Sequence, residues 1–129
     1  MNTDLRRLKQ DELTEKIIAC AYRVSNTLGC GFLEKVYENA LMIELKKLDL
    51  VATQQTSLSV HYDGLNVGEY YADIVVDQSV IIELKALKQL NDVHVAQCLN
   101  YLKATDFKVC LLINFGKPKV EIKRVVNQF

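Results

Sequence analysis

The sequence contains no tryptophan, a single proline and no apolar run long enough to cross a bilayer. The first sixteen residues, MNTDLRRLKQDELTEK, also lack the apolar stretch of a signal peptide. We therefore expect a cytoplasmic protein with no membrane partner. Repeats, low-complexity tracts and linkers are absent as well, so residues 1–129 are expected to form one domain.

The chain has no excess of either charge, because 16 Lys and Arg residues balance 16 Asp and Glu residues. Dedicated nucleic-acid-binding proteins often show a basic excess, so this balance counts weakly against such a partner. A local basic patch can still exist on a neutral molecule. The residues that could form one near the C-terminus are Lys117, Lys119, Lys123 and Arg124.

The four cysteines are scattered, with no C-x-x-C pair and no histidine at zinc spacing. We expect Cys20, Cys30, Cys98 and Cys110 to be reduced and mostly buried thiols rather than zinc ligands. The sequence also has no G-x-S-x-G, P-loop or G-x-G-x-x-G motif. These absences disfavour the enzyme classes that depend on those motifs.

Periodicity and turn residues predict an α/β protein. The predicted elements are helices over 11–28, 33–48 and 92–105, the last capped by Asn91 or Asp92, and strands over 56–62, 69–76, 80–87, 107–115 and 119–126. The apolar stripes of the first two helices are Leu13, Ile17, Ala21, Val24 and Leu28, then Tyr37, Leu41, Leu45 and Leu48. Three antiparallel strands followed by a helical crossover predict a mixed sheet flanked by helices.

The strand VIIELKAL places Glu83 and Lys85 on one face, because side chains alternate along a strand. If the hairpin loop before it has three residues, Val76 pairs with Val80 and Asp73 falls opposite Glu83. If the loop has two residues, the register moves by one and Asp73 is only a near neighbour. Directly opposed side chains have Cβ atoms about 5 Å apart.

Two carboxylates about 4 Å apart repel by roughly 4 kcal/mol at an effective dielectric of about 20. One interpretation is a solvated salt bridge in which Lys85 compensates part of this charge. The other is a divalent cation such as Mg²⁺, which is held by one or two carboxylates, water and substrate phosphate. Val75 and Ile81 share the faces of Asp73 and Glu83, which indicates a partly covered surface.

A third carboxylate, Glu34, lies seven residues before Leu41 and so falls on the apolar stripe of its helix. This spacing predicts a side chain that points toward the core side. The simpler interpretation is a first-turn acid favoured by the helix dipole. On the third helix, Gln97 and Tyr101 share a face, which is opposite the apolar stripe and could simply face solvent.

These residues resemble a known family. D73-x9-E83-x-K85 across a hairpin is similar to the signature of the PD-(D/E)XK nuclease superfamily, the fold of many restriction endonucleases. More narrowly, GFLEKVY (31–37) resembles the motif of the GxxExxY family, a small bacterial group within it. The segments YYADIVV, VIIELKAL, HVAQCLNYLKAT and LLINFG also resemble blocks of that family, so the similarity extends from about residue 12 to 126.

The resemblance implies a restriction-endonuclease-like fold and assigns roles to residues. Asp73 and Glu83 would be metal ligands, with Glu34 as a further ligand from the helix. Lys85 would orient or help to deprotonate the attacking water. Gln97 and Tyr101 match a Q-x-x-x-Y element and would position substrate or Lys85. Ala72 replaces the nominal proline before the first aspartate, at a position that is variable in such enzymes.

The leading hypothesis is Mg²⁺- or Mn²⁺-dependent hydrolysis of a phosphodiester, with DNA as the favoured nucleic acid. The resemblance is compatible with a homodimer, because small nuclease domains that cut a duplex often pair. The alternative is a nuclease-fold module that binds nucleic acid or a protein partner without strong turnover. Neutral net charge and the lack of an appended DNA-binding domain favour this alternative.

Overall fold

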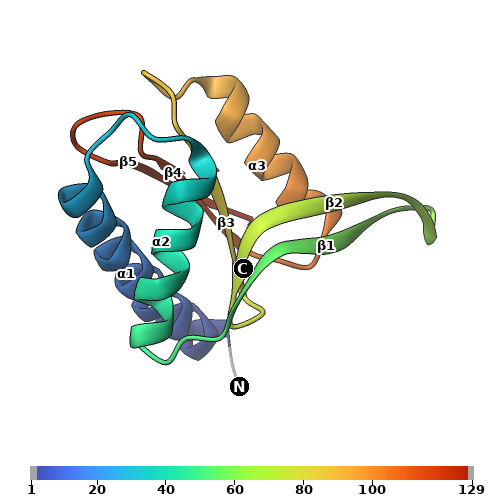
Figure 1. The fold of residues 1–129 in the computed structure, drawn as a ribbon. Helices are drawn as coiled ribbons and strands as arrows, with labels where there is room; N and C mark the ends of the chain where they lie inside the picture. Colours follow the sequence, from blue (N-terminus) through green and yellow to red (C-terminus); the bar gives the residue numbers. More distant parts are fainter. Residues whose placement is uncertain (1–2, 128–129) are drawn as a thin grey trace.

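The computed structural model describes residues 3–127, which form three helices and five strands (Figure 1). The elements in chain order are α1 (Thr3–Leu28), α2 (Glu34–Lys47), β1 (Ala52–Tyr62), β2 (Leu65–Val76), β3 (Val80–Lys85), α3 (Asp92–Ala104), β4 (Val109–Asn114) and β5 (Glu121–Val126). Every predicted element is present. α1 begins well before residue 11, since the Leu, Arg, Lys and Gln residues that precede it favour helix. β1 and β2 are also longer than predicted.

The five strands form one mixed sheet in the order β1-β2-β3-β4-β5. β3 and β4 are parallel, and the other neighbouring pairs are antiparallel. The parallel pair is joined by α3, as a crossover connection requires. Helices α1 and α2 cover one face of the sheet and α3 covers the other (Figure 1). The predicted α/β fold with a mixed sheet is confirmed.

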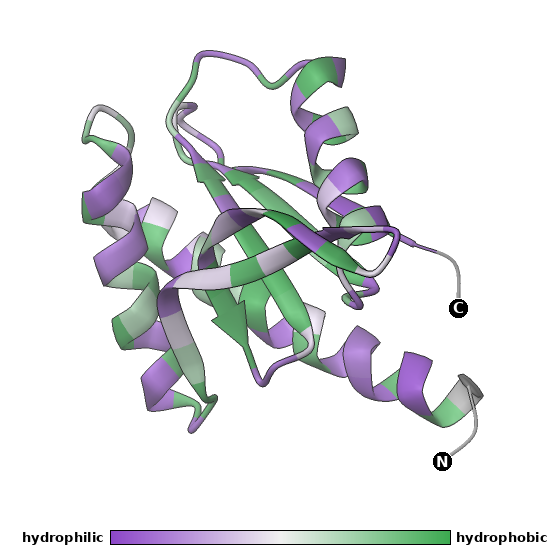
Figure 2. Ribbon diagram, turned by 90° about the vertical axis from the view of Figure 1, so that its right-hand side faces the viewer, coloured by the Kyte–Doolittle hydropathy of each residue, from purple (hydrophilic) through white to green (hydrophobic). Residues whose placement is uncertain are grey.

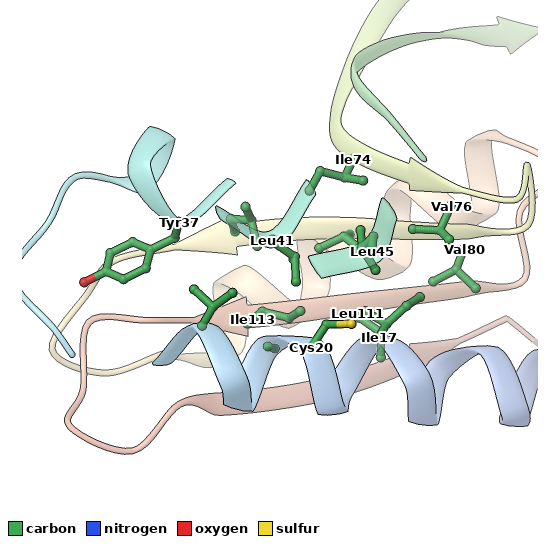
Figure 3. Close-up of a cluster of buried hydrophobic side chains, with 14 of the residues drawn as sticks. Ile17, Cys20, Tyr37, Leu41, Leu45, Ile74, Val76, Val80, Leu111 and Ile113 are labelled. Atoms are coloured by element: carbon green, nitrogen blue, oxygen red, sulfur yellow. The ribbon is translucent and has the colours of Figure 1, made fainter. Parts of the chain in front are cut away.

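Two hydrophobic clusters, one on each face, hold the sheet between the helices. Figure 2 shows that the central strands are hydrophobic along most of their length. On the α1–α2 face, Ile17 and Leu41 pack against Ile82 and Leu111; Figure 3 labels several members of this cluster. All six residues of β4 are buried, as the continuous apolar run predicted. Within the described chain, no helix is both long and apolar enough to cross a membrane.

The predicted stripes are buried except at their ends. Leu48 is exposed, contrary to prediction, because α2 ends at Lys47 and Leu48 is its C-terminal cap. Cys30 is also exposed, since it lies in the loop between α1 and α2, whereas the other three cysteines are buried. All four cysteines are free thiols, as expected.

The GFLEKVY segment contributes to the core through its tyrosine. The Tyr37 hydroxyl donates to the Gly29 carbonyl over 2.7 Å and accepts the Phe32 N–H over 3.2 Å. Its ring stacks on Phe115 with centroids 4.6 Å apart. Gly31 has φ +114°, a conformation that favours glycine, in the loop that Tyr37 secures. This part of the segment therefore has a structural role.

The β2–β3 hairpin has the three-residue loop among the two alternatives, with Val76 opposite Val80. Only three residue pairs join the strands, the last being Ile74 with Ile82. Beyond that point β2 leaves β3 and continues with β1 as a two-stranded projection (Figure 1). The sheet thus forks at Asp73 and Glu83.

Candidate active site

Asp73 and Glu83 are neighbours at this fork, as the three-residue loop predicted. Asp73 Oδ2 accepts the Leu84 N–H over 2.8 Å, and the Asp73 N–H donates to Glu83 Oε2 over 3.4 Å. Pairing between β2 and β3 ends at Ile74, so no β2 carbonyl accepts the Leu84 N–H of β3. The Asp73 carboxylate accepts this hydrogen bond instead. Each carboxylate is therefore fixed by the other residue's strand.

Glu83 sits in a partly buried position and holds its proton more tightly than an ordinary glutamate. Burial raises its pKa to about 8, the hydrogen bond from Tyr70 opposes this change, and the nearby Asp73 charge adds to it. The carboxyl group is consequently protonated at neutral pH unless a cation replaces the proton. This is one of the ways in which two adjacent carboxyl groups can be accommodated.

Tyr70 was not identified from the sequence, yet its hydroxyl donates directly to Glu83 Oε1. Burial, and then the Glu83 charge, raise the pKa of Tyr70 well above its usual range, so it stays a donor. Simple alternation would place Tyr71 rather than Tyr70 with Asp73. β2 changes faces here, because Ala72 belongs to the α3-side cluster and Ile74 to the opposite one. Strand periodicity therefore could not identify Tyr70.

Tyr101 reaches the site through Tyr70. The two rings stack with centroids 3.7 Å apart and planes inclined by 17°. Burial, and then the Glu83 charge, raise the pKa of Tyr101. Gln97 is exposed, and no hydrogen bond joins it to the carboxylates among residues 3–127. Of the predicted Q-x-x-x-Y pair, the structure brings only the tyrosine to the site.

Lys85 is half-buried at the end of β3, opposite Asn114 of β4. Its charge acts on Cys98 of α3, whose pKa is lowered mainly by a hydrogen bond with Cys110 and further by Lys85. In the part of the chain that the structure describes, no ion pair joins Lys85 to Asp73 or Glu83. The direct salt bridge of the first sequence interpretation is therefore not formed among the described residues.

The spacing of Glu34 from Leu41 predicted a side chain that points toward the core. This prediction is wrong, because Glu34 is exposed at the first turn of α2. One turn later, Glu38 is only 4% exposed and lies seven residues before buried Leu45. The same spacing argument applied to Leu45 would have identified Glu38. Glu34 is the acid that the helix start favours, because its carboxylate complements the helix dipole.

Glu38 is connected to Asp73 by one side chain. Gln55 Nε2 donates to Glu38 Oε1 over 3.1 Å and lies 3.4 Å from Asp73 Oδ1. Gln55 has φ +48° and is left unpaired in the β1–β2 ladder, although its neighbours Gln54 and Thr56 keep the same register. Such strained conformations persist where the surroundings enforce them, often at functional sites. Lys35 balances the Glu38 charge at 2.9 Å.

Two adjacent carboxylates suit a hard divalent cation that keeps several waters. Among the described residues, no group of three or more Asp, Glu, His or Cys side chains could hold a metal ion. The three-carboxylate set expected from Asp73, Glu83 and Glu34 is thus not assembled. Asp73 and Glu83 alone fit Mg²⁺ or Mn²⁺, with the remaining positions left for water and a phosphate oxygen.

Together, the fold and this site define an α/β protein with a paired-carboxylate centre and an adjacent lysine where a mixed sheet forks. The chain belongs to the PD-(D/E)XK nuclease superfamily, whose family model matches residues 11–125.

Solved structures resemble the chain in fold at low sequence identity. A protein described as SSO0001 is 18% identical with a TM-score of 0.51, covering 96% of this chain and 62% of that one. An alkaline exonuclease from Laribacter hongkongensis is 10% identical with a TM-score of 0.49, covering 89% and 82% respectively. No curated protein matches the sequence.

Proposed function

We propose that this protein is a metal-dependent nuclease that hydrolyses phosphodiester bonds, with DNA as the favoured substrate. The observation that carries the proposal is the juxtaposition of Asp73 and Glu83: Asp73 Oδ2 accepts the Leu84 N–H over 2.8 Å, and the Asp73 N–H donates to Glu83 Oε2 over 3.4 Å. Lys85 follows two residues after Glu83 on β3. Membership of the PD-(D/E)XK superfamily supports the same chemistry. The GFLEKVY segment further suggests the GxxExxY family and a bacterial, cytoplasmic protein.

In this proposal Asp73 and Glu83 hold Mg²⁺ or Mn²⁺. When bound, the cation lowers the pKa of a water molecule and stabilises charge on the scissile phosphate. Glu83 must release its proton to bind a cation, so its pKa of about 8 makes loading pH-dependent. Asp73 keeps its orientation through the Leu84 N–H.

Lys85 orients the attacking water or assists its deprotonation, and its charge offsets that of the phosphate. Tyr70 fixes the Glu83 carboxyl group, and Tyr101 supports the Tyr70 ring. Gln97, which is exposed, is available to substrate rather than to Lys85. The assignment of Glu34 as a third ligand rests on the sequence resemblance, whereas the contacts of Gln55 favour Glu38.

The test is cleavage of single- and double-stranded DNA and RNA with Mg²⁺ or Mn²⁺. Lys85→Ala should reduce cleavage by a factor of about 10² or more, the usual size of a general acid–base contribution. Asp73→Asn should abolish metal-dependent cleavage. The matched control is Lys88→Ala, which removes an exposed lysine three residues further on and should leave the rate unchanged. Cleavage that survives both active-site changes contradicts the proposal.

A second candidate function is a nuclease-fold binding module with weak or no turnover. The protonated state of Glu83 and the lack of a three-ligand cluster among residues 3–127 favour it. Calorimetric titration with Mn²⁺ distinguishes the two functions. A nuclease should bind the ion with an affinity that Glu83→Ala removes, whereas a chain that binds nucleic acid but no metal is a binding module.

A further inference from the structure

A cavity of about 560 Å³ lies beside the N-terminal half of α1, at the end of the sheet where β3 and β4 begin. Besides α1, its walls are formed by the β2–β3 turn at residues 77–79 and by residues 106–108, which precede β4. Figure 1 shows this turn close to the start of α1. The volume is in the usual range for small-molecule sites, about 300–1,000 Å³.

This cavity is separate from the candidate active site. Ser79 lines it directly before β3, and neither Asp73 nor Glu83 borders it. The strand from Ser79 to Glu83 covers roughly 13 Å, at about 3.3 Å per residue. A small ligand in the cavity is therefore held by residues that the nuclease proposal does not use.

Four cations surround the cavity without an acidic partner. They are Arg6, Lys9 and Lys16 of α1 and Lys108, which directly precedes β4. Within residues 3–127, none of the four makes an ion pair, although three acids line the same cavity. Lys and Arg side chains that converge on one cavity favour an anionic ligand, and phosphate is the anion that both bind most often.

The cavity also offers acceptors to a ligand that donates hydrogen bonds. Gln10 Nε2 donates to the Ser79 carbonyl over 3.3 Å, which fixes the orientation of the Gln10 amide. Gln10 Oε1 is buried and has no hydrogen-bond partner among the described residues. Buried polar atoms without a partner are rare and cost free energy. The acids that add carboxylate acceptors are Glu12, Asp77 and Asp106.

The rest of the lining is apolar. Leu13 and Leu50 contribute aliphatic surface, and the half-buried Phe107 contributes an aromatic ring. Aromatic rings stack on nucleobases of any sequence, because every base has a π-face. A ligand that uses the whole cavity therefore combines an anionic group, hydrogen-bond donors and a flat ring.

We infer that this cavity binds a nucleoside phosphate. The cations hold the phosphate, Phe107 stacks on the base, and the amino group of the base donates to Gln10 Oε1. The carboxylates accept from the sugar hydroxyls. An inorganic anion would leave the apolar lining and the buried acceptor unused. The same chemistry is carried by a free nucleotide and by the phosphorylated 5′ end of a strand.

The test is titration of ¹⁵N-labelled protein with ADP in the presence of a chelator, followed through the amide chemical shifts. Saturable shifts are expected at Gln10, Ser79 and Lys108, with a Kd below about 1 mM, and not at Glu83. Adenosine, which has no phosphate, should bind at least about tenfold more weakly. A deoxyadenosine trinucleotide with and without a 5′-phosphate, titrated in parallel, distinguishes a strand end from a free nucleotide.

Substitutions identify the groups that bind. Lys9→Glu and Lys108→Glu should each weaken ADP binding by about tenfold or more, because an attractive charge becomes repulsive. Gln10→Met keeps a similar volume without the acceptor and should weaken binding about three- to tenfold. The matched control is Lys119→Glu, the same change at an exposed lysine beyond the opposite end of β4, which should leave the affinity unchanged.

Three results overturn the inference. The first is the absence of saturable shifts with both ADP and the phosphorylated trinucleotide. The second is binding that persists in both Lys9→Glu and Lys108→Glu. The third is a set of shifts centred on Glu83. Circular dichroism separates lost binding from unfolding, which is not expected for the exposed Lys9. Since no metal is present, each result is independent of the nuclease proposal.

Discussion

The Tyr70 hydroxyl donates a hydrogen bond to Glu83 Oε1, joining a strand that has left the central sheet to one that remains within it. Tyr70 approaches Glu83 from one side and the Asp73 N–H from the other, so both oxygens of the carboxyl group have a donor. The group is thus held in place before any cation binds, which is the condition for an ordered metal site.

Tyr70→Phe should raise the pKa of Glu83 above about 8, because the hydrogen bond that lowers it is lost. Mn²⁺ binding should then weaken at neutral pH and recover at higher pH. The measurement is calorimetric titration at several pH values. Tyr71→Phe changes the adjacent, exposed tyrosine and serves as the control. A binding profile that is unchanged in Tyr70→Phe contradicts this role for the hydroxyl.

The metal-free protein should lose stability as the pH rises from about 4.5 to about 8. The folded pKa of Glu83 lies above its usual value of 4.5, so the folded state binds the extra proton in this window. Its contribution is fully present below the unfolded pKa and is lost on passing the folded pKa, with an upper limit of about 5 kcal/mol. Urea unfolding across this range measures it.

Glu83→Gln, which cannot ionise, should flatten that pH dependence. Saturating Mg²⁺ should also restore stability at the alkaline end for wild type, because the cation stabilises the deprotonated folded state. An equally steep loss of stability in Glu83→Gln would assign the effect to another group.

Two of the glutamates of α2, Glu34 and Glu38, separate what the helical spacing predicted from what the tertiary contacts show. Glu38→Gln should weaken Mn²⁺ binding by about tenfold, since Glu38 fixes Gln55, which in turn contacts Asp73. Glu34→Gln should have no effect on the affinity, because Glu34 is exposed and outside this network. Calorimetric titration of both variants under identical conditions decides between them, and the reverse ranking would restore Glu34 as the ligand.

Gly116→Ala should destabilise the fold by about 2–4 kcal/mol, the range of severe steric changes in a packed site. A Cβ atom at Gly116 would lie 2.1 Å from the Leu87 carbonyl oxygen and 2.3 Å from its nitrogen, and neither backbone atom can move freely. Asn114 already binds both of these Leu87 groups. Gly68→Ala, with nothing within 4 Å of the added atom, is the control. Urea unfolding midpoints of the two variants give the comparison.

Much of the fold could be predicted from local patterns. The helical stripe of α1 and the continuous apolar run of β4 identify core elements, because each depends on a regular period. The hairpin loop limited the β2–β3 pairing to two registers, and the structure has the three-residue loop, with Asp73 and Glu83 next to each other just beyond the last paired residues, Ile74 and Ile82. Of the two predicted caps of α3, Asn91 is the one that the structure has, with its side chain accepting the Val93 N–H.

The sequence analysis failed for site residues at positions where the regular helical or strand periodicity does not determine burial. Glu34 follows the helical spacing, but it lies at the exposed first turn, and helical phase does not specify where along a helix the sheet covers it. Strand alternation did not place Tyr70 on the same face as Asp73, because the face that β2 presents changes between Ala72 and Ile74. The sequence gives no indication that Gln55 adopts a left-handed conformation within a strand, because its neighbours contain no turn residues such as glycine or asparagine.

The sequence by itself determined one part of the site: Glu83 and Lys85 on one face of their strand, and Asp73 near Glu83 in either of two hairpin registers. Those relations follow from strand alternation and a short loop, which are local. Only the tertiary structure decided which other groups join them, namely Tyr70, Gln55 and Glu38, and where the β1–β2 projection leaves apolar residues exposed. These contacts depend on how strands twist apart and how a helix lies over them, and no local period encodes that arrangement.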